Sequence, residues 1–257
     1  MTTTAADSGF AELLVEDGIG TIRFHHPKGN SLPAALLRRL AECVTRAAAD
    51  AAVRVIVLRS EGDGPFCAGA SFDELKAIKD ERQGKEFFMG FARLILAMTR
   101  APQLIIARVH GRVVGGGVGV VAAADYAVAT HDASVRLSEL AVGIGPFVVG
   151  PVIERKIGVA HFAALAVDAG GWRDATWAER VGLFARLAAP IEELDASVSA
   201  LAATLARSNP QAMARMKAVF WAGTDDWDAL LERRAEISGA LVLSDFTRQA
   251  IAAFARR

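Results

Sequence analysis

The spacing of apolar residues changes several times along the first half of the chain, and these changes predict a layered core. Compact runs rich in β-branched residues, or short alternating runs, predict buried or half-buried strands. The expected strands are residues 13–15, 19–24, 53–58, 104–109, 125–130 and 134–137, with a turn at Asp17 and Gly18. Apolar residues at helical spacing predict helices at 31–50, 81–98 and 118–124. Strands that alternate with helices in this way are typical of an α/β fold.

The pattern becomes mainly helical beyond residue 158. One short strand is expected there, at residues 183–187. The expected helices are 192–207, 210–221, 227–241 and 245–257. We therefore expect two regions, an α/β core at residues 1–195 and a helical C-terminal region at 196–257.

Composition narrows the class of protein. The chain has 257 residues, of which 53% are hydrophobic, so it can fill a large core and, we expect, bury further apolar surface between subunits. Its 29 basic and 29 acidic residues balance, which argues against a nucleic-acid partner because such proteins need a basic face. The chain has only two cysteines, Cys43 and Cys67, so we expect no disulfide framework, which fits a reducing compartment. No apolar run is long enough to span a membrane. We therefore expect a cytoplasmic protein without a membrane anchor.

Two glycine-containing loops are candidates for ligand binding. Residues 64–73 follow a buried strand, and residues 115–119 lie between a strand and a helix. Small residues let a ligand approach the main chain, and free N–H groups near a helix start attract an oxyanion or a phosphate. The alternative to ligand binding is an ordinary turn for the first loop. For the second loop it is tight packing of the helix against the sheet.

Glu139 is the candidate acid or base. It lies in an otherwise apolar stretch, residues 138–146. A carboxylate among apolar neighbours has a raised pKa, which suits a proton-transfer group. A solvent-facing glutamate at the end of a strand is the alternative.

Other chemistry has weaker support in the sequence. His25 and His26 are adjacent, which does not suit one metal ion, and we expect no metal site. A nucleophilic role for Cys67 is not favoured, because no histidine lies beside it in the sequence. Residues 117–122 fit the dinucleotide pattern G-x-G-x-x-A, but residues 111–114 separate them from the preceding strand. A nicotinamide-dependent enzyme is therefore a minor alternative.

Five segments in order resemble the crotonase superfamily, also called the enoyl-CoA hydratase/isomerase family. The segments are residues 26–32, 66–71, 109–117, 138–144 and 253–257. The resemblance implies a crotonase-like spiral of ββα units with a C-terminal helical trimerisation region. It also implies a homo-trimer, or a hexamer built as a dimer of trimers, that acts on an acyl-CoA substrate.

The resemblance also implies roles for individual residues. The backbone N–H groups of Ala68 and Gly116 would form an oxyanion hole for the thioester carbonyl oxygen. The binding residues would be Cys67, Ala68, Gly69 and Ala70 for the adenine and pantetheine parts of coenzyme A, with Lys28 and, from a neighbouring subunit, Arg257 for its phosphates. Coenzyme A enters as part of the substrate, and no other cofactor is expected.

Catalysis is expected to depend on Glu139 as the acid/base. Hydratases of the family commonly carry a second glutamate at the position that Gly119 occupies here. The resemblance therefore leaves enoyl-CoA hydration and double-bond isomerisation open. Carboxylates that could replace the missing glutamate are Asp73, Glu74 and Glu154. An acyl-CoA-binding protein that has lost catalysis is the alternative from another class.

Overall fold

The fold begins with a β-hairpin. The computed structural model describes residues 9–254, and its first two strands are β1 (Phe10–Glu16) and β2 (Ile19–His25), paired antiparallel. Asp17 and Gly18 form the turn with φ angles of 50° and 81°, a region in which glycine is unstrained and aspartate is tolerated. The hairpin that the sequence predicts is confirmed.

Two sheets form the framework of residues 9–254. The main sheet has the order β1-β2-β3-β4-β6-β9, and its strands run parallel from β2 onward. The strands after the hairpin are β3 (Val55–Ser60), β4 (Leu104–Val109), β6 (Tyr126–Thr130) and β9 (Arg186–Ala188). The small sheet contains β5 (Val113–Val114), β7 (Ser134–Arg136) and β8 (Arg173–Asp174). The predicted α/β class is confirmed.

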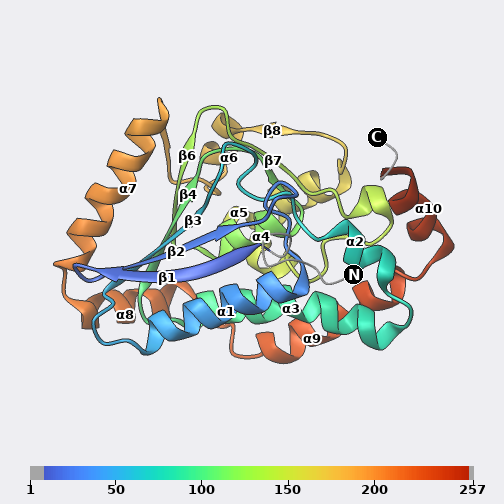
Figure 1. Ribbon diagram of the computed structural model, residues 1–257, viewed down its shortest axis with the longest axis horizontal. Coiled ribbons are helices and arrows are strands. Elements are labelled where there is room, and N and C mark those ends of the chain that lie inside the picture. Colours follow the sequence, from blue (N-terminus) through green and yellow to red (C-terminus); the bar gives the residue numbers. More distant parts are fainter. Residues whose placement is uncertain (1–8, 255–257) are drawn as a thin grey trace.

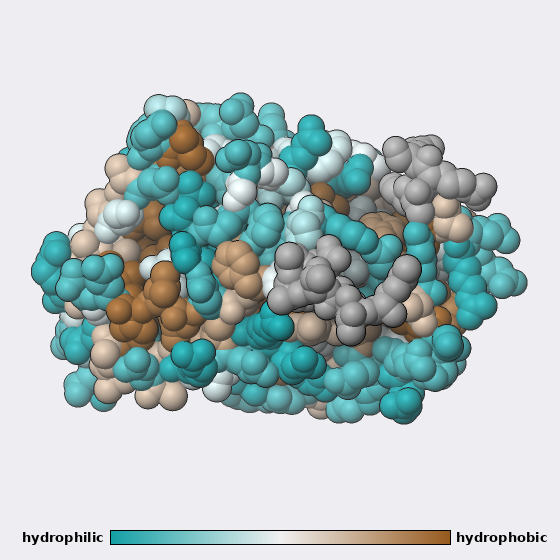
Figure 2. Space-filling model, viewed as in Figure 1, coloured by the Kyte–Doolittle hydropathy of each residue, from teal (hydrophilic) through white to brown (hydrophobic). Residues whose placement is uncertain are grey.

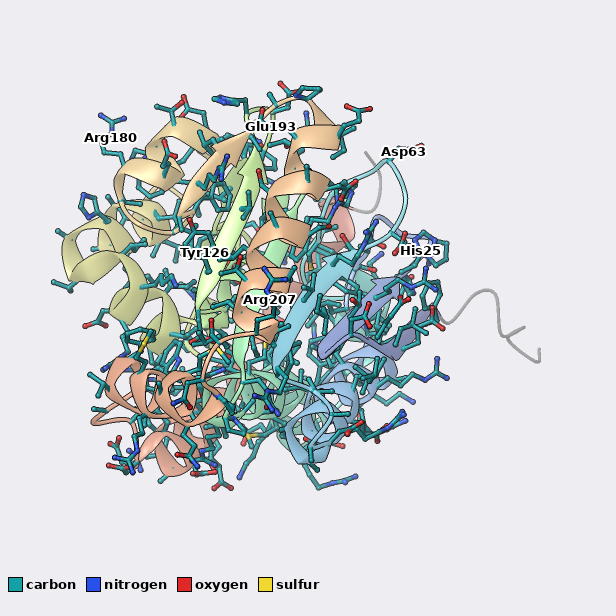
Figure 3. All side chains as sticks on the ribbon, turned by 90° about the vertical axis from the view of Figure 1, so that its left-hand side faces the viewer. His25, Asp63, Tyr126, Arg180, Glu193 and Arg207 are labelled. Atoms are coloured by element: carbon teal, nitrogen blue, oxygen red, sulfur yellow. The ribbon has the colours of Figure 1, made fainter. Side chains whose placement is uncertain are left out.

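Helices cover both faces of the main sheet (Figure 1). On one face α1 (Ala34–Ala49) packs on the hairpin, and α3 (Glu81–Arg100) packs on α1 and on α9 (Trp227–Leu241). On the other face lies α7 (Ile191–Ala206), which Figure 3 shows running from the region of Glu193 to that of Arg207. The expected boundary between the two regions, at residues 195 and 196, falls inside α7. That the chain forms two separate units, one on each side of this boundary, stays a prediction.

A short helix fills the centre of the molecule. All eight residues of α4 (Gly116–Ala123) are buried, because they are only glycine, valine and alanine and can pack on every side. Next to it lies α5 (Gly150–Val167), which bends at Gly158. The remaining helices are α2 (Phe72–Ala77), the 3-10 helix η2 (Leu140–Val142), α6 (Ala175–Arg180), α8 (Pro210–Phe220) and α10 (Asp245–Phe254). Among residues 9–254, none of the helices combines the length and the apolar character that crossing a membrane requires.

The strand expected at residues 183–187 is misplaced. The N–H groups of Leu183 and Phe184 both donate to the carbonyl of Ala178, at 2.9 and 3.1 Å, and so close the end of α6. Both side chains are buried in the core, so the apolar run reflects packing and the strand begins only at Arg186. The sequence interpretation also missed α5, α6 and β8.

Candidate active site

The two glycine-containing loops lie side by side. Cys67 pairs with Val113 in a parallel bridge, and the Val114 N–H donates to the Cys67 carbonyl at 2.9 Å. Gly69 follows with a φ of +87°, and a Cβ on it would lie 2.9 Å from the Val114 carbonyl oxygen. Only glycine fits this position without strain, because both its backbone angle and its contact exclude a side chain.

Two residues that line one cavity between these loops have unused N–H groups. Gly116 is the first residue of α4, and the first N–H groups of a helix have no partner within it. No backbone or side-chain hydrogen bond within residues 9–254 uses the N–H of Gly116 or of Ala70. Both residues line the same cavity, together with Glu139. Two such N–H groups at one cavity are suited to hold an oxyanion.

The position of Ala68 corrects one expectation. Ala68 also lines the cavity, but its N–H donates to the Gly29 carbonyl at 3.1 Å. A donor that already has a partner within the fold is not available to a ligand. Ala70, two residues later on this loop, lines the same cavity, and its N–H has no partner within residues 9–254. The glycine pattern could place the loop, but it could not tell which of its N–H groups is already used within the fold.

The Glu139 carboxyl group lies next to the start of α4. A Cβ on Gly115 would lie 3.1 Å from Glu139 Oε1, so the absence of a side chain there makes room for the carboxyl group. Glu139 Oε2 is shielded from solvent and has no hydrogen-bond partner among the described residues. This burial raises the pKa of Glu139 to about 7, although a bond to its own backbone lowers it slightly. A carboxyl group with this pKa can both take up and return a proton near neutral pH.

Apart from Ser138 and Ser238, the other side chains that line the cavity are apolar. Its wall includes Phe88 and Phe91 of α3 and the residues Val142, Ile144, Phe147 and Val149. A Cβ on Gly119 would lie 2.5 Å from Val149 Cγ1, closer than real Cβ contacts come. Val149 therefore occupies the place where a side chain at position 119 would begin. The sequence showed that Gly119 lacks a carboxylate side chain, but it could not show that Val149 fills the space beside it.

The other carboxylates considered from the sequence do not line this cavity. Asp73 is exposed and pairs with Lys28, which keeps the pKa of Asp73 below its usual value. Glu74 Oε2 accepts a hydrogen bond from the Ala34 N–H at 2.7 Å, at the start of α1. Glu154 is exposed and lines a neighbouring cavity. Of the described residues that line the cavity, Glu139 is the one carboxylate.

Cys67 and the glycines of the dinucleotide-like pattern have packing roles. Cys67 is buried, and burial raises the pKa of its thiol to about 12, which disfavours the reactive thiolate. A Cβ on Gly117 would lie 2.8 Å from Cys67 Sγ, so Gly117 allows α4 to pack closely on the loop. Gly117 and Gly119 both lie inside α4 rather than in a loop before it, which is not the arrangement that binds a pyrophosphate.

Two residues, Lys28 and Arg257, are expected from the sequence to bind the phosphates, and the structure describes only the first of them. Lys28 is exposed and pairs with Asp73, outside the lining of the cavity. Arg257 lies outside the residues that the structure describes. Within the described part of the chain, no three histidine, cysteine, aspartate or glutamate side chains gather closely enough to hold a metal ion.

Comparison with known proteins identifies relatives over almost the whole chain. Residues 15–255 match the sequence model of the family described as "Enoyl-CoA hydratase/isomerase". A probable enoyl-CoA hydratase of Bacillus subtilis is 28% identical over 244 residues, which cover 94% of each chain. A probable enoyl-CoA hydratase of Rhizobium meliloti is 31% identical, with coverage of 82% of this chain and 81% of the relative.

Solved structures show the same fold. An enoyl-CoA hydratase from Mycobacterium avium superposes with a TM-score of 0.84 at 30% identity, and 96% of each chain is covered. A structure from Bacillus halodurans superposes with a TM-score of 0.87 at 20% identity, which supports the fold alone. The crotonase-like fold expected from the sequence is therefore confirmed.

Proposed function

The chain belongs to the enoyl-CoA hydratase/isomerase family, and from this premise we propose that its cavity binds an enoyl-CoA thioester and that Glu139 moves a proton within the acyl group. The observation that carries the proposal is the convergence on one cavity of two unused N–H groups, from Ala70 and Gly116, and one buried carboxyl group.

The proposed chemistry begins with the thioester carbonyl oxygen between the N–H groups of Ala70 and Gly116. When the Glu139 carboxylate removes a proton from C2, the electron pair of the C–H bond moves toward that oxygen as an enolate. Two fixed donors stabilise this charge, and a single such donor contributes about 10²–10³ in rate. The protonated Glu139 then returns the proton to the acyl chain.

The lone carboxylate favours double-bond isomerisation within this family. A 3-enoyl thioester that loses a proton from C2 and gains one at C4 becomes a 2-enoyl thioester, and one carboxyl group can make both transfers. Hydration also requires a group that orients water, and Val149 fills the space beside Gly119 with a hydrocarbon side chain. Hydration is the second candidate, because relatives carry that name.

The nucleotide part of coenzyme A needs cations outside the acyl cavity. We propose that residues 67–70 contact the adenine and pantetheine parts and that Lys28 contacts the phosphates, while the role of Arg257 remains a prediction. A cavity of about 430 Å³ near α2 and α10 is lined by Lys76, Lys79 and Arg248, which offer further positive charge. CoA and its 3′-dephospho form, compared as inhibitors, test whether these cations bind the 3′-phosphate.

Self-association is part of the proposal. Large apolar side chains are exposed on three helices. On α5, Val159 is 64% exposed and Val167 is 75% exposed, while Val219 on α8 is 71% exposed and Phe246 on α10 is 67% exposed. Figure 2 shows another apolar area on the left, over the turn end of the hairpin, where Leu14 and Val15 are exposed. Exposed apolar side chains in such numbers are typical of subunit interfaces. We propose a homo-trimer or a dimer of trimers, which sedimentation equilibrium can test.

Two absorbance assays test the proposed reaction. With 3-enoyl-CoA substrates of several lengths, isomerisation creates the conjugated 2-enoyl thioester and its absorbance increases. With 2-enoyl-CoA substrates, hydration removes the conjugation and the absorbance decreases. We expect turnover of the 3-enoyl series. A protein that binds these thioesters but turns over neither series would instead be a binding protein without catalysis.

A further inference from the structure

The acyl cavity is small and has a neighbour. Its volume is about 50 Å³, whereas cavities that hold small ligands commonly measure about 300–1,000 Å³. A second cavity of about 170 Å³ adjoins it, and both are lined by Pro146 and Phe147. An acyl chain that outgrows the first cavity therefore meets the second one next, on the other side of Phe147.

Phe147 is the partition between the two cavities. It follows Gly145, whose φ of +85° turns the chain, and a Cβ on Gly145 would lie 2.8 Å from Phe147 Cε2. The ring thus folds back over its own loop and is half-buried. An acyl chain that extends from one cavity into the other must therefore pass this ring and Pro146, which also lines both cavities.

Helix α9 lies along both cavities. Ser238 lines the first cavity and Arg234 lines the second. These residues are four apart on one helix, so their side chains project from the same face, about one turn from each other. A chain that passes Ser238 in the direction of Arg234 therefore follows the helix axis.

The second cavity is lined by a positively charged side chain, that of Arg234, which has no ion-pair partner among the described residues. Arg234 is half-buried, and no ion pair within residues 9–254 includes it. Glu154 lines the same cavity but is more exposed and lies outside ion-pair distance of Arg234. The other lining residues are apolar or backbone, including Phe162 and Ala166. A guanidinium held in such a place favours a carboxylate, which it can bind through two parallel hydrogen bonds.

We propose that the acyl group of the substrate passes Phe147 and ends in a carboxylate that binds Arg234. The preferred substrates are then CoA thioesters of dicarboxylic acids rather than simple fatty acids. This inference rests on the proposed function for the position of the thioester, but its charge preference can be measured by binding alone.

The experiment compares saturated acyl-CoA ligands of five to eight carbons that end in either a carboxylate or a methyl group. Saturated thioesters bind without undergoing isomerisation or hydration, so calorimetry reports affinity apart from turnover. In the wild-type protein we expect the carboxylate-ended ligand of the best length to bind roughly 10- to 100-fold more tightly than its methyl-ended counterpart. Arg234→Met should remove this preference and leave the affinity for the methyl-ended ligand within about threefold.

Matched variants separate the charge of Arg234 from other effects. Arg233→Met removes the neighbouring exposed guanidinium, which lines neither cavity, and should keep the preference. Arg234→Lys should keep part of it, because the charge remains while the paired hydrogen bonds are lost. Equal affinity of the wild-type protein for both ligand series would overturn the inference. A preference that survives in Arg234→Met would do the same.

Failure of the proposed function gives a different result. In that case neither ligand series binds with measurable affinity, and enoyl-CoA substrates are not turned over. Tight binding of the methyl-ended series without charge preference would leave the proposed function intact and reject only the role of Arg234.

Discussion

The Val149 side chain fills the space that a side chain at Gly119 would need, since a Cβ on Gly119 would lie 2.5 Å from Val149 Cγ1 and 2.6 Å from Val149 Cβ. Gly119 lies on α4 and Val149 immediately precedes α5, so the contact joins the two helices at the wall of the cavity. The result is a site in which Glu139 faces hydrocarbon rather than a second acid.

The contact predicts that changes at these two positions are coupled. Gly119→Ala should lower the free energy of unfolding by about 1–3 kcal/mol, because the added methyl group overpacks the contact. In the Val149→Gly background the same change should cost less, with a coupling of at least about 0.5 kcal/mol in a double-mutant cycle. Urea denaturation measures all four proteins.

The control for this cycle is Gly170→Ala. A Cβ on Gly170 would meet nothing within 4 Å, so this change should alter stability by no more than about 0.5 kcal/mol. Strictly additive effects of the changes at positions 119 and 149 would contradict the packing described for them.

A second prediction concerns the loop that carries the Ala70 N–H. Gly69→Ala adds a Cβ at a φ of +87° and 2.9 Å from the Val114 carbonyl oxygen, so the loop must shift and move the donor at Ala70. We expect kcat/KM to fall by about 10²–10³. Gly64→Ala, in the same loop but with nothing within 4 Å of its new Cβ, should leave kcat/KM nearly unchanged. Comparable losses in both variants would reject the special role of the donor.

The raised pKa of Glu139 predicts a pH dependence of activity. If the carboxylate is the base, kcat/KM should rise with pH through an apparent pKa near 7. Asp73→Asn should keep this profile, because Asp73 is exposed and does not line the cavity. A profile that rises near pH 4.5, the ordinary value for glutamate, would mean that Glu139 is not buried as described.

The same pKa predicts a pH dependence of stability. In the folded chain Glu139 keeps its proton up to about pH 7, whereas in the unfolded chain it loses that proton near pH 4.5. The unfolded state therefore binds fewer protons between these values, and the contribution of Glu139 to stability declines as the pH rises through this window. Glu139→Gln does not titrate, so its stability relative to the wild type should be greater at pH 8 than at pH 5. A constant difference in urea midpoint at the two pH values would contradict this.

Removing one partner of a buried ion pair outside the cavity lining should cause a large loss of stability. Lys217 Nζ of α8 lies 3.0 Å from Asp125 Oδ2, and their side chains are 2% and 4% exposed. Asp125 Oδ2 also accepts a hydrogen bond from the Ile105 N–H at 2.8 Å. Lys217→Met should lower the free energy of unfolding by about 3–5 kcal/mol, because it removes the cation that is paired with a buried carboxylate. Arg38→Met, which breaks an exposed pair with Glu42, should change stability by at most about 1 kcal/mol in urea denaturation.

The sequence predicts the fold better than the details of the site. The strands of the main sheet have compact apolar runs of their own, so β3, β4 and β6 could be placed from sequence. Leu183 and Phe184 show why β9 could not, since residues buried in a loop have the same apolar character as a strand. The apolar pattern indicates which residues are buried, but it does not distinguish a buried strand from a buried loop.

Site residues illustrate the same limit. Glu139 stands out because it is charged in an apolar stretch, and the glycines of both loops stand out by composition. The choice between Ala68 and Ala70 depends on a contact with Gly29, and the role of Val149 depends on a contact with Gly119. These pairs lie far apart in the chain, so no local pattern encodes them.

The most direct test follows hydrogen exchange at C2 of a saturated acyl-CoA in D₂O by NMR. We predict that the wild-type protein incorporates deuterium at C2, because Glu139 removes the proton while the N–H groups of Ala70 and Gly116 hold the carbonyl oxygen. Glu139→Gln should bind the same thioester but exchange at least ~10²-fold more slowly. Exchange at the wild-type rate in Glu139→Gln, or its absence in a wild-type protein that binds the thioester, would contradict the account.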